Sequence, residues 1–107
     1  MKNLRWAAAL GLCAVFAAPA VHAQSGQDLL YVRSLAATCA NCHGTQGVAV
    51  EGSRVGSLAG LERSYIVAQM QAFKGGTRPA TIMHQISKGY SDAQIDTLAT
   101  YFAAQKK

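Results

Sequence analysis

The sequence lacks the residue patterns that mark hydrolases and nucleotide-binding enzymes. Its 107 residues contain no glycine-rich phosphate loop, no Ser/His/Asp arrangement, no paired carboxylates and no internal repeat. Basic residues are dispersed except for Lys106-Lys107, so no nucleic-acid partner is indicated. Cysteine is also scarce, with three residues in the whole chain. These absences argue against hydrolytic catalysis and draw attention to the few cysteines and histidines.

The N-terminal segment Met1–Ala23 has the pattern of a secretory signal peptide. Two positive charges precede the apolar run Trp6–Ala18, and Val21-His22-Ala23 ends in the small-residue pattern of a cleavage site. The alternative is a membrane anchor that stays in place, although the apolar run is short for a membrane span. We therefore expect the cleaved chain to be periplasmic and to have no membrane anchor.

The predicted mature chain, residues 24–107, is long enough for one small domain. It carries eight Lys/Arg and five Asp/Glu, a net charge of +3 compared with +5 for the whole sequence. Cys13 would be removed with the signal peptide, so Cys39 and Cys42 would be the cysteines left. A domain of this size buries a modest core.

The two remaining cysteines belong to the segment Cys39-Ala40-Asn41-Cys42-His43, which is the attachment signature of c-type haem. Two intervening residues allow each thiol to form a thioether bond with one vinyl group of the same haem. The histidine that follows can then supply a nitrogen ligand to the iron. A haem would also provide the apolar centre that so small a chain lacks, and we expect the apoprotein to be poorly folded.

Three other interpretations of this motif have to be considered. A thioredoxin-like dithiol should lie near a βαβ pattern, and the sequence shows none. A zinc site needs two further ligands, and His84 is the one additional Cys or His of the predicted mature chain. A structural disulfide with an uninvolved histidine is the third. We favour haem attachment over these three.

Periodicity predicts helices over 25–38, 62–74 and 81–88, and a last helix that begins after Ser91. The segment Gly44–Gly60 is rich in glycine and is predicted to be a loop that passes round a bulky group. Ser91 and Gln94 fit a capping box. The first and last helices have similar apolar faces and are expected to pack together. Further expected N-caps are Ser25 or Gly26 and Ser64.

A second axial ligand of the iron would determine what the haem can do. The candidates are Met70, Met83, His84 or no protein ligand. Met70 lies in the apolar stripe of a helix, where methionine usually fills a core. Met83 follows Arg78-Pro79 in a segment that must bend towards the haem, which favours it. A Met/His iron has a filled coordination shell and a raised reduction potential, whereas an open iron would suit ligand sensing or peroxidase chemistry.

Several segments extend this pattern along the predicted mature chain. They are Cys39-Ala40-Asn41-Cys42-His43-Gly44, Ser57-Leu58-Ala59-Gly60, the helix from Tyr65 to Phe73, and the tail from Tyr90 to Phe102. Together they resemble the small class I c-type cytochromes of the bacterial c4/c553 type. The resemblance implies an all-α fold of about four short helices around one covalently attached haem c, held by Cys39 and Cys42. It also implies His43 and Met83 as axial ligands.

The segment Arg78–Tyr90 is similar to the cytochrome subunit of flavocytochrome c sulfide dehydrogenase. This similarity implies an FAD-containing flavoprotein partner that oxidises sulfide and passes electrons to the haem. Some such subunits carry two haems, whereas one attachment motif here implies a one-haem form. Many relatives have proline before Ser-Leu-Ala-Gly, where this chain has Gly56, and this leaves open which carbonyl orients His43.

The function expected from these features is periplasmic electron transfer by a subunit that is not catalytic alone. The partners would be the sulfide-oxidising flavoprotein and other periplasmic redox proteins. A free soluble shuttle is one alternative, and a haem sensor or peroxidase with an open iron is another. We expect Leu58, Tyr65 and Ile82 to exclude water from the haem. The candidate docking cations are Arg54, Arg63, Lys74, Arg78 and Lys88.

Overall fold

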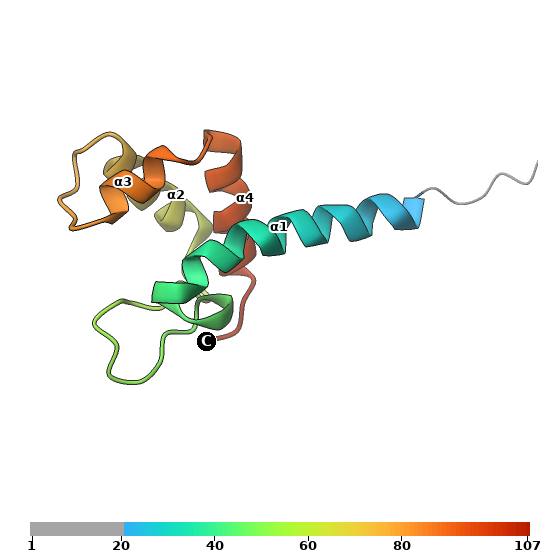
Figure 1. The fold of residues 1–107 in the computed structure, drawn as a ribbon, viewed down its shortest axis with the longest axis horizontal. Coiled ribbons are helices and arrows are strands. Elements are labelled where there is room, and N and C mark those ends of the chain that lie inside the picture. Colours follow the sequence, from blue (N-terminus) through green and yellow to red (C-terminus); the bar gives the residue numbers. More distant parts are fainter. Residues whose placement is uncertain (1–20) are drawn as a thin grey trace, which may run out of the picture.

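The computed structural model describes residues 21–107 and consists, over that range, of four α-helices without a β-strand (Figure 1). This confirms the predicted all-α class. The helices are α1 (Val21–His43), α2 (Arg63–Lys74), α3 (Met83–Lys88) and α4 (Asp92–Ala103), with a 3₁₀ turn η1 at Thr45–Gly47. Across residues 21–107, no helix combines the length and the apolarity needed to cross a membrane. Most of the predicted signal peptide, 1–23, lies outside the described residues, so that boundary stays a prediction.

Helix α1 is longer than predicted at both ends. It does not begin at a cap on Ser25 or Gly26, and it continues through the haem attachment motif to His43. No glycine or proline occurs within the motif, so the helix ends only where Gly44 adopts a positive φ of 82°. Residues three and four apart share a helix face, and the continuous helix therefore presents Cys39, Cys42 and His43 on one side.

The core of the described chain lies where α1, α2 and α4 meet. Its buried cluster is Ala36 of α1, Ile66 of α2, and Leu98, Ala99 and Phe102 of α4. Helix α4 contributes most because its apolar residues recur at helical spacing. Small residues at the contact allow α1 and α4 to approach closely, and this confirms the expected pairing of the first and last helices.

The helix ends agree with the sequence in part. The capping box of α4 is present: Gln94 N donates to Ser91 Oγ at 3.2 Å, and Ser91 N donates to Gln94 Oε1 at 3.0 Å. The prediction that Ser64 caps α2 was wrong, because the helix begins at Arg63, before Ser64. Its N-cap is Glu62, which forms no side-chain cap bond. Ser64 therefore lies inside the first turn, where its hydroxyl does not perform the capping role.

Replacing Ser91 by Ala should lower the free energy of unfolding by about 1 kcal/mol, because it leaves a helix N-terminal N–H without its partner. Ser64→Ala is the matched control and should change this free energy by less than about 0.5 kcal/mol. Urea unfolding of the holoprotein, followed by far-ultraviolet circular dichroism, measures both. An equal loss in the two variants would contradict the different roles of these serines.

Candidate haem site

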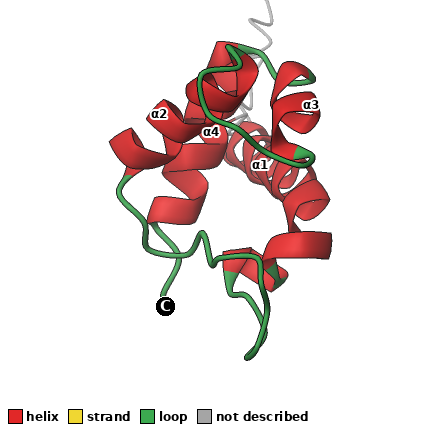
Figure 2. Cartoon of the chain, turned by 90° about the vertical axis from the view of Figure 1, so that its left-hand side faces the viewer, coloured by secondary structure: helices red, strands yellow, loops and turns green. Residues whose placement is uncertain are grey.

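The C-terminal end of α1 lies between two other parts of the chain. In both views, the glycine-rich loop after η1 and the α2–α3 pair lie on opposite sides of this end (Figures 1 and 2). This loop is joined to the attachment motif through Gly44 and η1, whereas α3 begins with Met83. Of the two predicted ligands, His43 is therefore the last residue of α1, and Met83 lies on α3, which faces that end of α1.

Cys39 and Cys42 are free thiols and are not joined by a disulfide. Cys42 is exposed, and Cys39 is half-buried at the edge of the core cluster. Burial raises the pKa of the Cys39 thiol above its ordinary value, and the nearby Cys42 raises it further, while a contact with the Thr38 hydroxyl acts in the opposite direction. Since no disulfide joins the two cysteines, both sulfur atoms are available for covalent attachment of a haem.

The ring of His43 is held in one orientation by the loop. Its Nδ1 lies 2.6 Å from the backbone carbonyl oxygen of Gly56. A carbonyl can only accept, so Nδ1 carries the proton and donates this hydrogen bond. The neutral ring then has its lone pair on Nε2, which is the nitrogen left to bind a metal. This answers the question that the sequence left open, namely which carbonyl orients His43.

The position of Gly56 depends on how the loop is closed at its base. The carbonyl of Gly47 accepts hydrogen bonds from Leu58 N at 2.7 Å and Ala59 N at 3.1 Å. Beside it, Ala49 N donates to Ser57 Oγ at 2.9 Å. The loop consequently leaves η1 and returns to it at one point, which brings the Gly56 carbonyl back to His43.

The candidates for the second ligand occupy different environments. Met70 packs against the core cluster from α2. Met83 is the first residue of α3 and is half-buried without belonging to that cluster. His84 follows it, and its Nδ1 is a buried nitrogen that has no hydrogen-bond partner in the described structure. Of the two methionines, Met83 is thus the one that core packing leaves available.

The residues around the motif fit a haem. Large apolar side chains are exposed on the loop, α2 and the start of α3, including Val55, Tyr65 at 50 % and Ile82 at 57 %. Tyr65 and Ile82 were predicted to exclude water, and a flat apolar ring would give them a surface to cover. Within residues 21–107, by contrast, there is no group of three or more His, Cys, Asp or Glu side chains that could hold a metal ion. The donor set suits haem iron better than zinc.

Comparisons with known proteins agree with this chemistry. Cytochrome c-554(548) of Halomonas halodenitrificans is 31 % identical over 72 residues, which are 64 % of this chain and 86 % of that protein. No protein-family model matches. The chain belongs to the c-type cytochromes. The cytochrome therefore carries covalently bound haem c and functions in electron transfer.

Two further proteins are similar to the cytochrome in sequence. The cytochrome subunit of sulfide dehydrogenase from Chlorobaculum tepidum is 37 % identical over 73 residues, which are 68 % of this chain and 64 % of that protein. The cytochrome c4 structure from Acidithiobacillus ferrooxidans has a TM-score of 0.58 and 36 % identity, over 62 % of this chain and 37 % of that one. The cytochrome thus spans less than two thirds of each of these two proteins, and it has the class I cytochrome c fold.

Sequence reasoning missed two side chains that contact the site. The hydroxyl of Thr38 lies 3.9 Å from Cys39 Sγ and 2.6 Å from the hydroxyl of Tyr90. Thr38 directly precedes Cys39 in the sequence, and this position could have indicated that its side chain lies near the motif. The partnership with Tyr90 joins residues far apart in the sequence, and no local pattern predicts it.

Two glycines near His43 should respond differently to replacement by Ala. A Cβ on Gly44 would lie 1.8 Å from the carbonyl oxygen of Val48, and the residue has a positive φ, so Gly44→Ala should cost more than about 2 kcal/mol. Gly56 has open space and no positive φ, so Gly56→Ala should be neutral or stabilise by up to about 1 kcal/mol. Denaturant unfolding of both holoproteins measures this, and a similar cost for both would refute the difference.

Proposed function

We propose that the cytochrome transfers single electrons through one haem c whose iron is bound by His43 and Met83. The observation that carries the proposal is the hydrogen bond from His43 Nδ1 to the Gly56 carbonyl, which fixes the ring and leaves Nε2 for iron. Cys39 and Cys42, on the same helix face, would form the two thioether bonds. Met83 would approach from α3 on the other side.

Bound haem c supplies a reversible one-electron iron couple. The chain's contribution is to keep the ligands in one geometry in both oxidation states. The Gly56 carbonyl prevents the His43 ring from rotating, and the closed base of the loop holds that carbonyl in place. A half-buried thioether such as that of Met83 favours the reduced iron and therefore raises the reduction potential. A rigid, fully ligated iron suits electron transfer better than the alternative of a sensor or peroxidase.

Replacing Met83 by Leu should abolish the methionine–iron charge-transfer band of the oxidised protein and allow carbon monoxide to bind the reduced protein. Met70→Leu is the matched control, because Met70 packs in the core and a substitution of similar volume costs less than about 1.5 kcal/mol. Absorption spectra of the two holoproteins provide the test. A band that survives in Met83→Leu, or is lost in Met70→Leu, would reassign the ligand.

The partner we propose is a sulfide-oxidising, FAD-containing flavoprotein in the periplasm, reached after cleavage of residues 1–23. The support is the similarity to the cytochrome subunit of sulfide dehydrogenase, of which the cytochrome spans 64 %. A free periplasmic shuttle is the competing proposal. Both require a surface at which a redox partner can approach the haem.

The candidate docking cations differ in how far they are already engaged. Arg63 is bonded to Asp96, and Lys74 to Asp92 at 2.9 Å. Arg78 stacks over the Phe73 ring at 4.6 Å and is also bonded to Gln69. In the described part of the chain, neither Arg54 nor Lys88 forms an ion pair. These two cations can therefore bind a partner's carboxylates without first breaking an ion pair.

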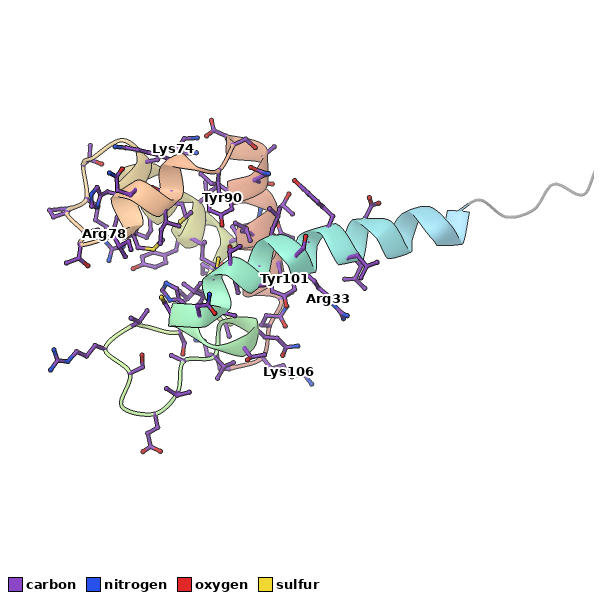
Figure 3. All side chains as sticks on the ribbon, viewed as in Figure 1. Arg33, Lys74, Arg78, Tyr90, Tyr101 and Lys106 are labelled. Carbon is purple, nitrogen blue, oxygen red and sulfur yellow. The ribbon has the colours of Figure 1, made fainter. Side chains whose placement is uncertain are left out.

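A tagged mature protein should isolate a flavin-containing protein from its own periplasm at low salt. The double variant Arg54→Gln/Lys88→Gln should recover at least about threefold less of this protein, because carboxylates on the partner then lose the two cations that attract them. Lys106→Gln/Lys107→Gln is the matched control, and Lys106 projects from the C-terminal end of the chain (Figure 3). Absorption and mass spectrometry identify the bound protein. A haem-positive cytochrome that is recovered alone would favour the free shuttle.

A further inference from the structure

Tyr90 links two parts of the site that are distant in sequence. It lies in the connection between α3 and α4, and its side chain extends towards α1 (Figure 3). Its hydroxyl oxygen is 2.6 Å from Thr38 Oγ1, on the residue directly before Cys39. This is a short bond between hydroxyl groups, and it joins the haem attachment end of α1 to the end of α3.

The direction of this hydrogen bond follows from the number of available protons. Thr38 Oγ1 donates its one proton to the carbonyl of Leu35 at 2.8 Å, within α1. Thr38 must therefore accept from Tyr90, and Tyr90 is the donor. Replacing Tyr90 by Phe removes the donor, and replacing Thr38 by Val removes the acceptor, so the two variants should break the same bond.

The backbone of Tyr90 is fixed from the opposite side. Its carbonyl accepts from Lys74 Nζ of α2 at 2.8 Å, and its N–H donates to the Ser87 carbonyl of α3 at 3.2 Å. Lys74 in turn is paired with Asp92 at 2.9 Å, and Gln71 donates to the same carboxylate at 3.0 Å. The hydrogen bond from Gln71 and the hydrogen bond and charge of Lys74 hold the pKa of Asp92 below its ordinary value.

We propose that Tyr90 is a positioning residue that sets the separation between the two sides of the haem site. On one side are Cys39 and His43 of α1, and on the other is Met83 of α3. This inference rests on the proposed ligation by His43 and Met83. Tyr90 does not contact the iron, and its effect is transmitted through the elements that carry the ligands.

The packing of the helices explains why such a link is needed. Helix α3 has six residues and packs mainly on α2, whereas α1 packs on η1 and α4. The ligand-bearing elements α1 and α3 are therefore joined chiefly through other helices. The hydrogen bond between Thr38 of α1 and Tyr90, two residues after α3 ends, limits how far α3 can move away and take Met83 with it.

The experiment is a titration of the oxidised holoprotein with imidazole, followed by loss of the methionine–iron charge-transfer band. Imidazole can bind only where Met83 has left the iron, so its apparent affinity reports the population of the open state. Tyr90→Phe and Thr38→Val should each bind imidazole about three- to tenfold more tightly, the effect of losing one hydrogen bond. Thr38→Ser keeps the acceptor and should retain the wild-type affinity.

The matched control is Tyr31→Phe. Tyr31 is also a tyrosine whose hydroxyl forms an interhelical bond, here accepted from Gln94 Nε2 at 3.2 Å, but this bond joins α1 to α4 and leaves α3 untouched. Tyr31→Phe should have the wild-type affinity, and the Tyr90→Phe/Thr38→Val double variant should match the single variants. An equal change in Tyr31→Phe would overturn the proposal by assigning the effect to general loosening of α1.

The remaining outcomes separate this inference from the proposed function. A wild-type protein that shows the charge-transfer band, with unchanged imidazole affinity in both Tyr90→Phe and Thr38→Val, would overturn the role of Tyr90 alone. A wild-type protein without that band would overturn the ligation by Met83, and with it the inference.

Discussion

The hydrogen bond from His43 to the Gly56 carbonyl is the contact on which the site depends. It fixes the tautomer of an imidazole that is otherwise free to rotate, and it requires a backbone carbonyl at one particular place. Three features keep this carbonyl in place. They are the closed base of the loop, the abrupt end of α1 at Gly44 and the packing of α4 against the base of the loop. A main-chain acceptor cannot be removed by substitution of a side chain, so this hydrogen bond does not depend on the side chain at position 56.

On the opposite side of the site, α3 is also held in place by hydrogen bonds, but these come from side chains. There the chain uses side chains, namely the hydroxyls of Tyr90 and Thr38 and the cation of Lys74, to hold a short helix in place. Such bonds are individually modest and can be removed one at a time. One side of the site is therefore fixed by main-chain geometry, whereas the other is held by side chains that substitution can change.

Much of this arrangement was predictable from local sequence. The attachment motif, the periodicity of α4 and its capping box are all short-range patterns, and the structure contains each of them. The errors have local causes as well. Ser64 has the right residue type for an N-cap, but α2 begins one residue before it, and α1 extends further than its composition suggested. The role of the Gly56 carbonyl could not be predicted, because every residue type has a backbone carbonyl. The Thr38–Tyr90 bond could not be predicted either, because residues 52 positions apart form no recognisable local sequence pattern.

The loop that begins after Gly47 and ends at Leu58 has a consequence for how such proteins diversify. Because it leaves and returns at one point, its tip at Glu51 and Gly52 is exposed and can accept inserted residues without displacing either end. Val50, three-quarters exposed, lies on the same tip. The surface that a neighbouring protein meets there can thus change by insertion, while the hydrogen-bonded base of the loop keeps its geometry.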